Sequence, residues 1–553
     1  MTNSSKRWLY AVWLALIGGF AVLHALHLRA DFPNHSPWYM DWAKYTDEGW
    51  YGNAAIRAHL TGSWYLPGDF NPAPAVPAWP LVEWVLFFFT GVTLEAARGL
   101  AVAVFFANLL LSYLLLRSRG SRWMALLALT LLVTSPFLYC FSRLAILEPM
   151  LTAFTLGALN LAVRLPRLRR PVWAALWIGL LFALMALTKA TAVFLLPALG
   201  WAMLLPLWRN PKPEPLGTGL RPWGGKLFAR SALAAAGAFA VAYGLWMTLV
   251  VRSGLLPDYK YLFIVNRYDK PPEFYWPLVS FWWSFHGGLW VDRILIPLAG
   301  LVVLGAALAG RGARARNLLL DPVFGASVLA VAGCILFMTC QNHPQPRYFA
   351  VVAFFSFFLV AQGAEALLGD TAPMREPAAG RPLTRLLGWA VIGLAALAAA
   401  VNGAWTLDYA LHPEYTFVDA ASRLTQYIDK HPNGNRLLVS ISGDQITLVT
   451  HLPALCDDFG APGGSMPDLP AKLAFYRPGW YATWNDLDPT TLEDLHSRFS
   501  LEQVASFRAF DDPDRNLLVL FKLHPLPGGL VRDSATQNLQ IPLPGDKIEI
   551  PVE

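Results

Sequence analysis

Long apolar segments separated by short polar stretches dominate this 553-residue chain as far as about position 405. A helix needs about 20 apolar residues to cross a bilayer, and about eleven segments come close to that length. The pattern therefore predicts a polytopic α-helical membrane protein. We expect spans at about 8–28, 100–116, up to 139, 147–164, on either side of Thr188-Lys189, 231–251, up to 311, up to 339, 349–364 and 386–405.

Clusters of arginine follow alternate spans and orient the chain. They lie near residues 117–122, 164–170 and 311–316, and cytoplasmic loops characteristically carry such an excess of positive charge. This predicts a cytoplasmic N-terminus, with the loop after the first span, the loop at 252–290 and the C-terminal region outside. The apolar stretch Pro80–Thr90 is too short to span, and counting it as a span would reverse this alternation. We therefore expect an interfacial helix there.

The region after about Asp408 has the composition of a soluble domain. Its apolar periodicity predicts helices at Val418–His431 and Asp488–Phe499. Strands are expected at 437–441, 504–510 and 517–523, the last two paired. This is a small α/β domain, expected to be periplasmic or otherwise extracytoplasmic. The predicted division is a transmembrane domain at 1–407, the α/β domain at 408–525 and an extended Pro/Gly-rich tail at 526–553.

Composition supports this class of protein and excludes others. Charged residues make up 14% of the chain, against about 25% in soluble proteins, and the mean hydropathy is +0.41. The net charge of +6 follows from topology, so we expect membrane lipids and no nucleic acid as partners. The four cysteines form neither a disulfide framework nor a metal-binding pattern. The expected location is the inner (plasma) membrane, crossed several times.

The most informative polar stretch is Tyr45-Thr46-Asp47-Glu48-Gly49-Trp50-Tyr51, in the first outer loop. Two adjacent carboxylates lie among aromatic residues at the membrane surface. A helix can run from Asp47 to about Leu60, so both acids fall in its first turn. Acidic residues there often only complement the helix dipole, and that alternative remains open from this stretch alone.

Other ionisable residues gather at the outer ends of spans, where charge is costly unless it is paired or used. Arg143 and Glu148 flank one outer turn, and Lys189 lies in the next. Arg347 and Tyr348 follow a rigid turn built on two prolines. His286 ends an aromatic-rich run that suits either an interfacial belt or a groove for an isoprenoid chain or sugar ring. Glu148 could complement a dipole and Lys189 could snorkel, but a single outer cavity could collect them all.

Four sequence stretches carry a resemblance to a known family: DEGWYGNAA, LAILEPMLTAF, ALTKATAVFLLP and HPQPRYFAVVAFF. In their order and spacing the chain resembles the GT-C-fold glycosyltransferases of the family 39-like group, which holds protein O-mannosyltransferases and lipid A aminoarabinose transferases. The resemblance covers roughly the first 360 residues. It implies a GT-C-like membrane domain and transfer of a sugar from a polyprenyl-phosphate-linked donor to an acceptor hydroxyl outside the membrane. The acceptor stays open among lipid, glycan and protein.

One departure from the resembled group affects the donor site. Many bacterial relatives carry a Lys-Pro pair before the interfacial helix, and that Lys is thought to meet the donor phosphate. Here the stretch is NPAPAVPAWP, without lysine. We therefore expect Arg347, Lys189 or Arg267 to bind the phosphate. The other expected substrate-binding residues are Tyr348, Arg143, His286 and Tyr51.

The residues fit that chemistry. A polyprenyl phosphate is already a good leaving group, so the reaction needs a carboxylate base and cations for the developing phosphate charge. We expect Asp47 to be the base, with Glu48 or Glu148 orienting hydroxyl groups. A single displacement inverts the anomeric centre and needs no enzyme nucleophile. Asp47, Glu48 and Glu148 could together hold a divalent cation, but the resembled group generally acts without one, so no metal or other cofactor is expected.

Two other classes of function compete. A transporter or lipid-linked sugar flippase predicts inverted repeats and charges near the membrane midplane. This chain has charges at span ends and no detectable repeat. A membrane-anchored scaffold would leave two separate acidic motifs at the outer surface unexplained. The transporter or flippase remains the alternative prediction.

Overall fold

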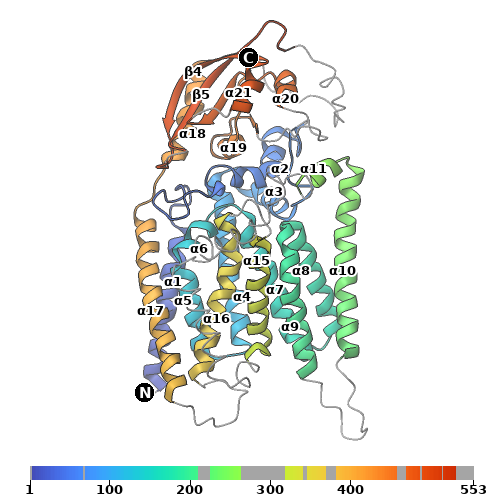
Figure 1. Cartoon of the computed structure of the whole chain (residues 1–553), viewed down its shortest axis with the longest axis vertical. Coiled ribbons are helices and arrows are strands. Elements are labelled where there is room, and N and C mark those ends of the chain that lie inside the picture. Colours follow the sequence, from blue (N-terminus) through green and yellow to red (C-terminus); the bar gives the residue numbers. More distant parts are fainter. Residues whose placement is uncertain are drawn as a thin grey trace.

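The computed structural model describes residues 3–66, 69–209, 225–262, 318–339, 345–368, 382–457, 469–485, 489–512 and 515–530. Figure 1 shows a bundle of long helices with a smaller sheet-containing domain at one end. The N-terminus lies at the opposite end of the bundle. A layer of short helices, including α2 (Asp47–Thr61), α3 (Ala78–Thr90) and α11 (Leu256–Lys260), separates the bundle from the small domain. The polytopic helical protein with a small C-terminal α/β domain that the sequence predicts is therefore observed.

The bundle is built around helix α16 (Ala350–Leu368). Of its most apolar stretch 89% is buried, whereas the corresponding stretch of α10 (Gly225–Arg252) is 6% buried and lies at the periphery. A helix that is apolar all round must meet either other helices or lipid. The remaining long helices are α1 (Asn3–Ala25), α4 (Leu94–Arg117), α5 (Arg122–Thr134), α7 (Leu147–Arg164), α8 (Pro171–Thr188), α9 (Leu196–Arg209), α15 (Pro322–Thr339) and α17 (Pro382–Leu411).

Within the described residues, eight helices are long and apolar enough to cross a membrane, or nine if a bent pair counts as one span. That pair is α5 and α6 (Pro136–Ser142), which meet at 67°. The predicted third span, drawn as continuous to Tyr139, is therefore wrong in this detail. Pro136 has no N–H for the preceding turn, and Ser135 caps a new helix by accepting a hydrogen bond from the Leu138 N–H. The predicted span ending at Arg311 lies outside the described residues.

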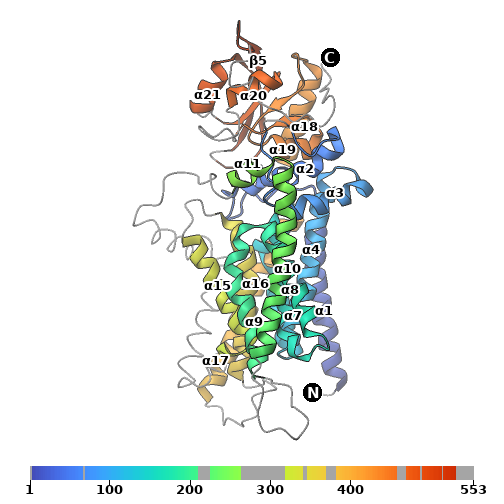
Figure 2. The ribbon, with the colours of Figure 1, turned by 90° about the vertical axis from the view of Figure 1, so that its right-hand side faces the viewer.

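The segment between α1 and α4, residues 26–93, is here named the first loop. It contains the 3-10 helix η1 (Trp42–Lys44), helix α2 (Asp47–Thr61) and helix α3 (Ala78–Thr90). Helix α3 confirms the predicted interfacial helix. It buries Trp79 while Phe89 remains 84% exposed, and Figure 2 shows it projecting sideways at the junction of bundle and small domain. Such a one-sided apolar helix is suited to lie in the membrane interface.

The small domain contains a mixed five-stranded sheet in the order β2-β1-β3-β5-β4. Strands β1 and β2, and β1 and β3, are parallel, whereas β5 pairs antiparallel with β3 and β4. The predicted helices, the first strand and the final strand pair are confirmed as α18, α21, β1, β4 and β5. The elements are α18 (Thr416–Lys430), β1 (Leu438–Val439), α19 (Gly443–Thr450), β2 (Ala454–Leu455), α20 (Leu469–Tyr476), β3 (Trp480–Trp484), α21 (Pro489–His496), β4 (Phe499–Arg508) and β5 (Leu517–Pro525).

The first loop and the small domain share their cores. Tyr45 packs into one apolar cluster of the domain and Leu66 into the other. Lys44 forms a buried ion pair with Asp512 of the domain. Removing one partner of a buried ion pair typically costs about 3–5 kcal/mol, because the other charge is left unpaired. The domain is thus joined to the first loop, which contains α2, by packed side chains and paired charges.

Candidate active site

The first part of the site is a buried ionic cluster in which Arg347 lies between Asp41 and Asp47. Arg347 belongs to the 3-10 helix η6 (Pro346–Phe349), which leads into α16. Its Nη1 lies 2.5 Å from Asp41 Oδ1, its backbone N–H donates to Asp41 Oδ2 at 2.8 Å, and its Nη2 lies 2.6 Å from Asp47 Oδ2. Asp41 also caps η1 by accepting from the Ala43 N–H. The cluster joins the first loop to the core helix of the bundle.

The two oxygens of Asp47 differ in their surroundings. Oδ1 accepts a hydrogen bond of 2.9 Å from the Thr46 hydroxyl. Oδ2 is close to the Arg347 guanidinium but, within the described part of the chain, receives no hydrogen bond of acceptable geometry. Burial raises the pKa of Asp47, and the positive charge of Arg347 only partly offsets this. Asp47 is thus a carboxylate with an oxygen available to take a proton.

Its neighbour Glu48 is surrounded by donors. Arg98 donates to both carboxylate oxygens, at 2.7 and 2.6 Å. The Ala145 N–H donates at 2.9 Å and the Gln445 side-chain amide at 3.0 Å. The side chain is completely buried. Glu48 therefore connects α2 to α4, to the turn before α7 and to the small domain, and the two predicted acidic motifs are linked through it.

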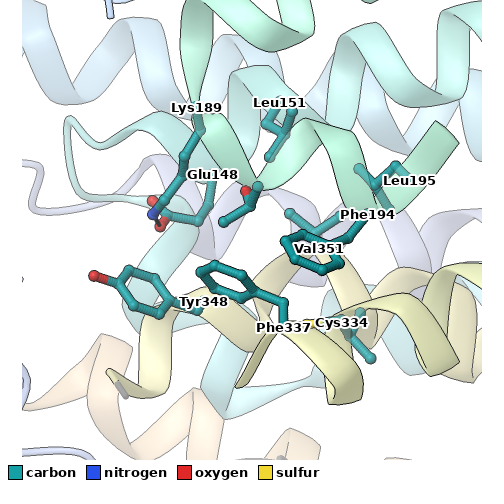
Figure 3. Close-up of a pocket in the computed structure, with 11 residues that line it drawn as sticks. Glu148, Leu151, Lys189, Phe194, Leu195, Cys334, Phe337, Tyr348 and Val351 are labelled. Atoms are coloured by element: carbon teal, nitrogen blue, oxygen red, sulfur yellow. Dashed lines mark hydrogen bonds and ion pairs between the residues drawn. The ribbon is translucent and has the colours of Figure 1, made fainter. Parts of the chain in front are cut away.

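The second part of the site is the Glu148–Lys189 pair beside Tyr348. Glu148 lies in the first turn of α7, and Lys189 is the single residue between α8 and the 3-10 helix η3 (Ala190–Leu195). Lys189 Nζ forms an ion pair with Glu148 Oε1 and lies 4.0 Å from the centre of the Tyr348 ring. Glu148 Oε2 is buried without a hydrogen-bond partner among the described residues. Figure 3 shows the three side chains converging.

These groups lie at one end of a small pocket. Its other walls are apolar, and Figure 3 shows Phe194, Leu195, Phe337 and Val351 lining them. A polar end joined to apolar walls is suited to a molecule with a charged head and a hydrocarbon chain.

The two ionic clusters adjoin one another. The Arg347 guanidinium lies 5.0 Å from the centre of the Tyr348 ring, which Lys189 also faces. Among the described residues, Asp41, Asp47 and Glu148 form their ion pairs with two cations, Arg347 and Lys189. Within the described ranges, no group of three His, Cys, Asp or Glu residues is arranged to hold a metal ion. The three acids that the sequence predicts are each paired with a different basic residue: Asp47 with Arg347, Glu48 with Arg98 and Glu148 with Lys189.

The remaining predicted site residues fall into three positions. Tyr51 is buried on α2, and burial together with the charge of Asp47 raises its pKa well above the ordinary value. Arg143 donates to the Leu26 and His27 carbonyls at 2.6 Å each, so it holds the end of α1. Arg267, His286 and the aromatic loop lie outside the described residues. Asp41 was missed, because its sequence neighbours give no sign of a partner 306 positions away.

Comparison with known proteins agrees with the fold described above. Residues 83–243 match the family model of the dolichyl-phosphate-mannose-protein mannosyltransferases. That stretch runs from α3 to α10 and includes Glu148 and Lys189, but neither Asp47 nor Arg347. No curated protein sequence matches the chain.

Two solved structures are similar in fold. The ArnT structure from Cupriavidus metallidurans with bound undecaprenyl phosphate has a TM-score of 0.55 at 14% identity, covering 94% of this chain and 98% of that chain. The arabinofuranosyltransferase AftD from Mycobacteria has a TM-score of 0.50 at 14% identity, covering 94% of this chain and 40% of that chain. The chain thus shares its overall fold with these glycosyltransferases, which are of the GT-C type, and its residues 83–243 resemble the mannosyltransferase family.

Proposed function

We propose that this chain transfers a sugar from a polyprenyl-phosphate donor to a hydroxyl group of a lipid, glycan or protein at the outer face of the membrane, with inversion. The observation that carries the proposal is the buried Asp47 carboxylate, held by the Arg347 guanidinium next to a pocket with a charged end and apolar walls. The bound undecaprenyl phosphate in the ArnT structure supports the choice of donor class.

In this proposal the pocket holds the donor near its phosphate. Lys189 pairs with the phosphate in place of Glu148, and the apolar walls contact the first isoprene units. Glu148, with one oxygen already free of hydrogen-bond partners within the described chain, accepts hydrogen bonds from the sugar hydroxyls. Tyr348 packs beside Lys189 and keeps the cation at the polar end.

The transfer is a single displacement. Asp47 Oδ2 takes the proton from the acceptor hydroxyl while the oxygen of that hydroxyl forms a bond to the anomeric carbon. The bond from that carbon to the phosphate oxygen breaks, and the electron pair leaves with the polyprenyl phosphate. Attack from the face opposite the leaving group inverts the anomeric centre. Arg347 holds Asp47 in place, and Lys189 stabilises the departing phosphate.

Glu48 has a positioning role in this scheme. Its oxygens receive four hydrogen bonds from protein donors, so they are already engaged. The Glu48–Ala145 hydrogen bond connects the turn that carries Asp47 with the one that leads to Glu148. We therefore propose that Glu148 orients the sugar hydroxyls. Glu48 sets the distance between Asp47 and Glu148.

The test uses purified protein, a panel of radiolabelled polyprenyl-phosphate sugars and a membrane extract as acceptor. Asp47→Asn removes the base and is expected to lower the rate of transfer about 10²- to 10⁴-fold, with donor binding retained. Asp321→Asn is the matched control, since Asp321 is ion-paired with Arg119 at the far end of the bundle. Equal transfer by wild type and Asp47→Asn contradicts the proposal. Movement of lipid-linked sugar across vesicles without transfer favours the flippase alternative.

A further inference from the structure

Helix α19 of the small domain lies directly against helix α2, as Figure 1 shows. The contact is closest at Gly49, where a Cβ atom would stand 2.2 Å from the carbonyl carbon of Asp444. No side chain fits in that space without moving one backbone away from the other. Gly49 is two residues after Asp47, so the small domain touches the turn that carries the proposed base.

One stripe of α2 makes the contact. Gly49, Asn53 and Arg57 follow each other at intervals of four, which places them on one face of the helix. Asn53 and Arg57 donate to the carboxylate of Asp444 at 3.4 and 2.9 Å. The Gly49 N–H donates to Gln445 Oε1 at 2.8 Å. The two consecutive domain residues thus hold two successive turns of α2.

The Gln445 contact supplies a cap that α2 lacks. The first N–H groups of a helix have no partner within it, and an N-cap side chain usually accepts from one of them. Thr46 occupies the N-cap position here but makes no such bond, and its hydroxyl lies within hydrogen-bond distance of Trp42 O and Asp47 Oδ1 instead. Gln445 Oε1 takes its place, from 396 positions along the chain.

The same amide serves Glu48. Gln445 Nε2 donates to Glu48 Oε2 at 3.0 Å, so one side-chain amide bonds two consecutive residues that directly follow Asp47, Glu48 and Gly49. Gln445 is completely buried, and both of its polar atoms are used in these contacts. A glutamine is suited to this position because it donates and accepts at the same time.

We propose that Gln445 is a positioning residue for Asp47, so that the small domain completes the active site from outside the membrane helices. This rests on the proposed function, in which Asp47 is the base. Gln445 bonds Gly49 and Glu48 in the first turn of α2, and so fixes Asp47 relative to Arg347 and the pocket. A displacement of about 1 Å in a reacting group can cost about 100-fold in rate, so this support bears directly on catalysis.

The experiment measures kcat and donor KM for the full-length protein. Gln445→Leu keeps the shape but loses both hydrogen bonds, and it is expected to lower kcat about 10- to 100-fold. The donor KM should stay within about twofold, because Gln445 is not among the residues that line the pocket. The matched control is Thr450→Val on the same helix, since the Thr450 hydroxyl bonds Ile446 O and the Leu452 N–H, next to it in sequence, and no other described residue. It should leave kcat unchanged.

Gln445→Glu separates positioning from general folding. Its carboxylate can still accept from Gly49, but when ionised it meets Glu48 with like charge. When protonated it can donate to Glu48 as the amide did. Relative to wild type at each pH, this variant should be slow at neutral pH and regain activity as the pH is lowered. A constant ratio to wild type overturns the proposal even where Gln445→Leu fails to fold.

The outcomes also separate this proposal from the proposed function. If Asp47→Asn is inactive while Gln445→Leu has wild-type kcat, the positioning role alone is overturned. If Asp47→Asn transfers as well as wild type, the proposed base is wrong and the positioning role falls with it. A loss of kcat in Gln445→Leu, with unchanged donor KM and an unaffected Thr450→Val control, supports the positioning role.

Discussion

Helix α2 contributes to two buried charge clusters that differ in how completely their carboxylates are paired. In the interface cluster, Asp69 accepts from Lys472 and Arg57, and Asp444 accepts from Arg57 and Asn53. Every carboxylate oxygen there has a donor. In the site cluster, Glu148 Oε2 has none within the described residues, and Asp47 Oδ2 has an ion-pair contact with Arg347 Nη2 at 2.6 Å that lacks hydrogen-bond geometry. Both clusters are buried, so burial alone does not distinguish a structural cluster from a functional one.

The difference teaches where function is to be sought in buried charge. Leaving a buried carboxylate oxygen without a donor is unfavourable, and a protein core normally avoids it. The site cluster keeps such an oxygen, Glu148 Oε2, at the polar end of the pocket that Figure 3 shows, where in the proposed function substrate hydroxyls supply the donor. Asp47 and Glu48 show the same contrast at neighbouring positions, since Glu48 receives four hydrogen bonds and Asp47 Oδ2 none of good geometry.

The largest expected effect comes from breaking the interface cluster. Lys472→Met leaves Asp69 with Arg57 alone, and the loss of one buried partner should lower the free energy of unfolding by about 3–5 kcal/mol. The midpoint of thermal unfolding in detergent measures this. Exposed Lys430→Met on α18 is the control and should change little. The kcat of the folded fraction should stay close to that of wild type, and a large fall in kcat without lower stability would remove the distinction between the clusters.

A smaller effect is expected in the site cluster, where the rate of transfer should fall. Glu148→Gln removes the charge that pairs with Lys189 and, in the proposed function, weakens the hydrogen bonds to the sugar. Hydrogen bonds to charged groups are worth about 1.5–3 kcal/mol, so transfer should slow about 10- to 100-fold. Thermal stability should fall as well, because Lys189 loses its ion-pair partner, so the rate is measured on the folded fraction. Rates of transfer and unfolding midpoints measured on both variants decide whether the interface cluster serves stability and the site cluster serves transfer.

Much of the fold could be predicted from the sequence because local patterns determine it. The helix from Asp47, the interfacial helix that became α3 and the paired strands β4 and β5 all follow from apolar periodicity and turn residues. The break at Pro136 was missed, since an apolar pattern that continues past a proline does not show that the helix bends. The short strands β1 and β2 depend on pairing with distant segments, which no local pattern specifies.

The candidate site was predictable in its members more than in their partners. Lys189, Glu148 and Arg347 stand out because charge is rare near the ends of apolar spans. Asp41 and Gln445 do not stand out, since polar residues are ordinary in loops and soluble domains. Their roles arise from contacts across 306 and 396 positions, which only the folded chain brings together. Likewise, the four donors that surround Glu48 could not be inferred from its place beside Asp47.

The smallest expected effect concerns pH. Asp47 must be ionised to take a proton, and burial raises its pKa, so kcat/KM should fall with decreasing pH at values above the ordinary aspartate pKa of about 3.9. The negative charge of Asp41 contributes to this rise. Asp41→Asn should therefore move the acidic limb of the pH profile to lower pH, whatever it does to the maximal rate. Exposed Asp419→Asn should leave the limb in place. A limb that moves to higher pH in Asp41→Asn would mean that a group other than Asp47 governs it, and that the Asp47 carboxylate is not where the acceptor proton goes.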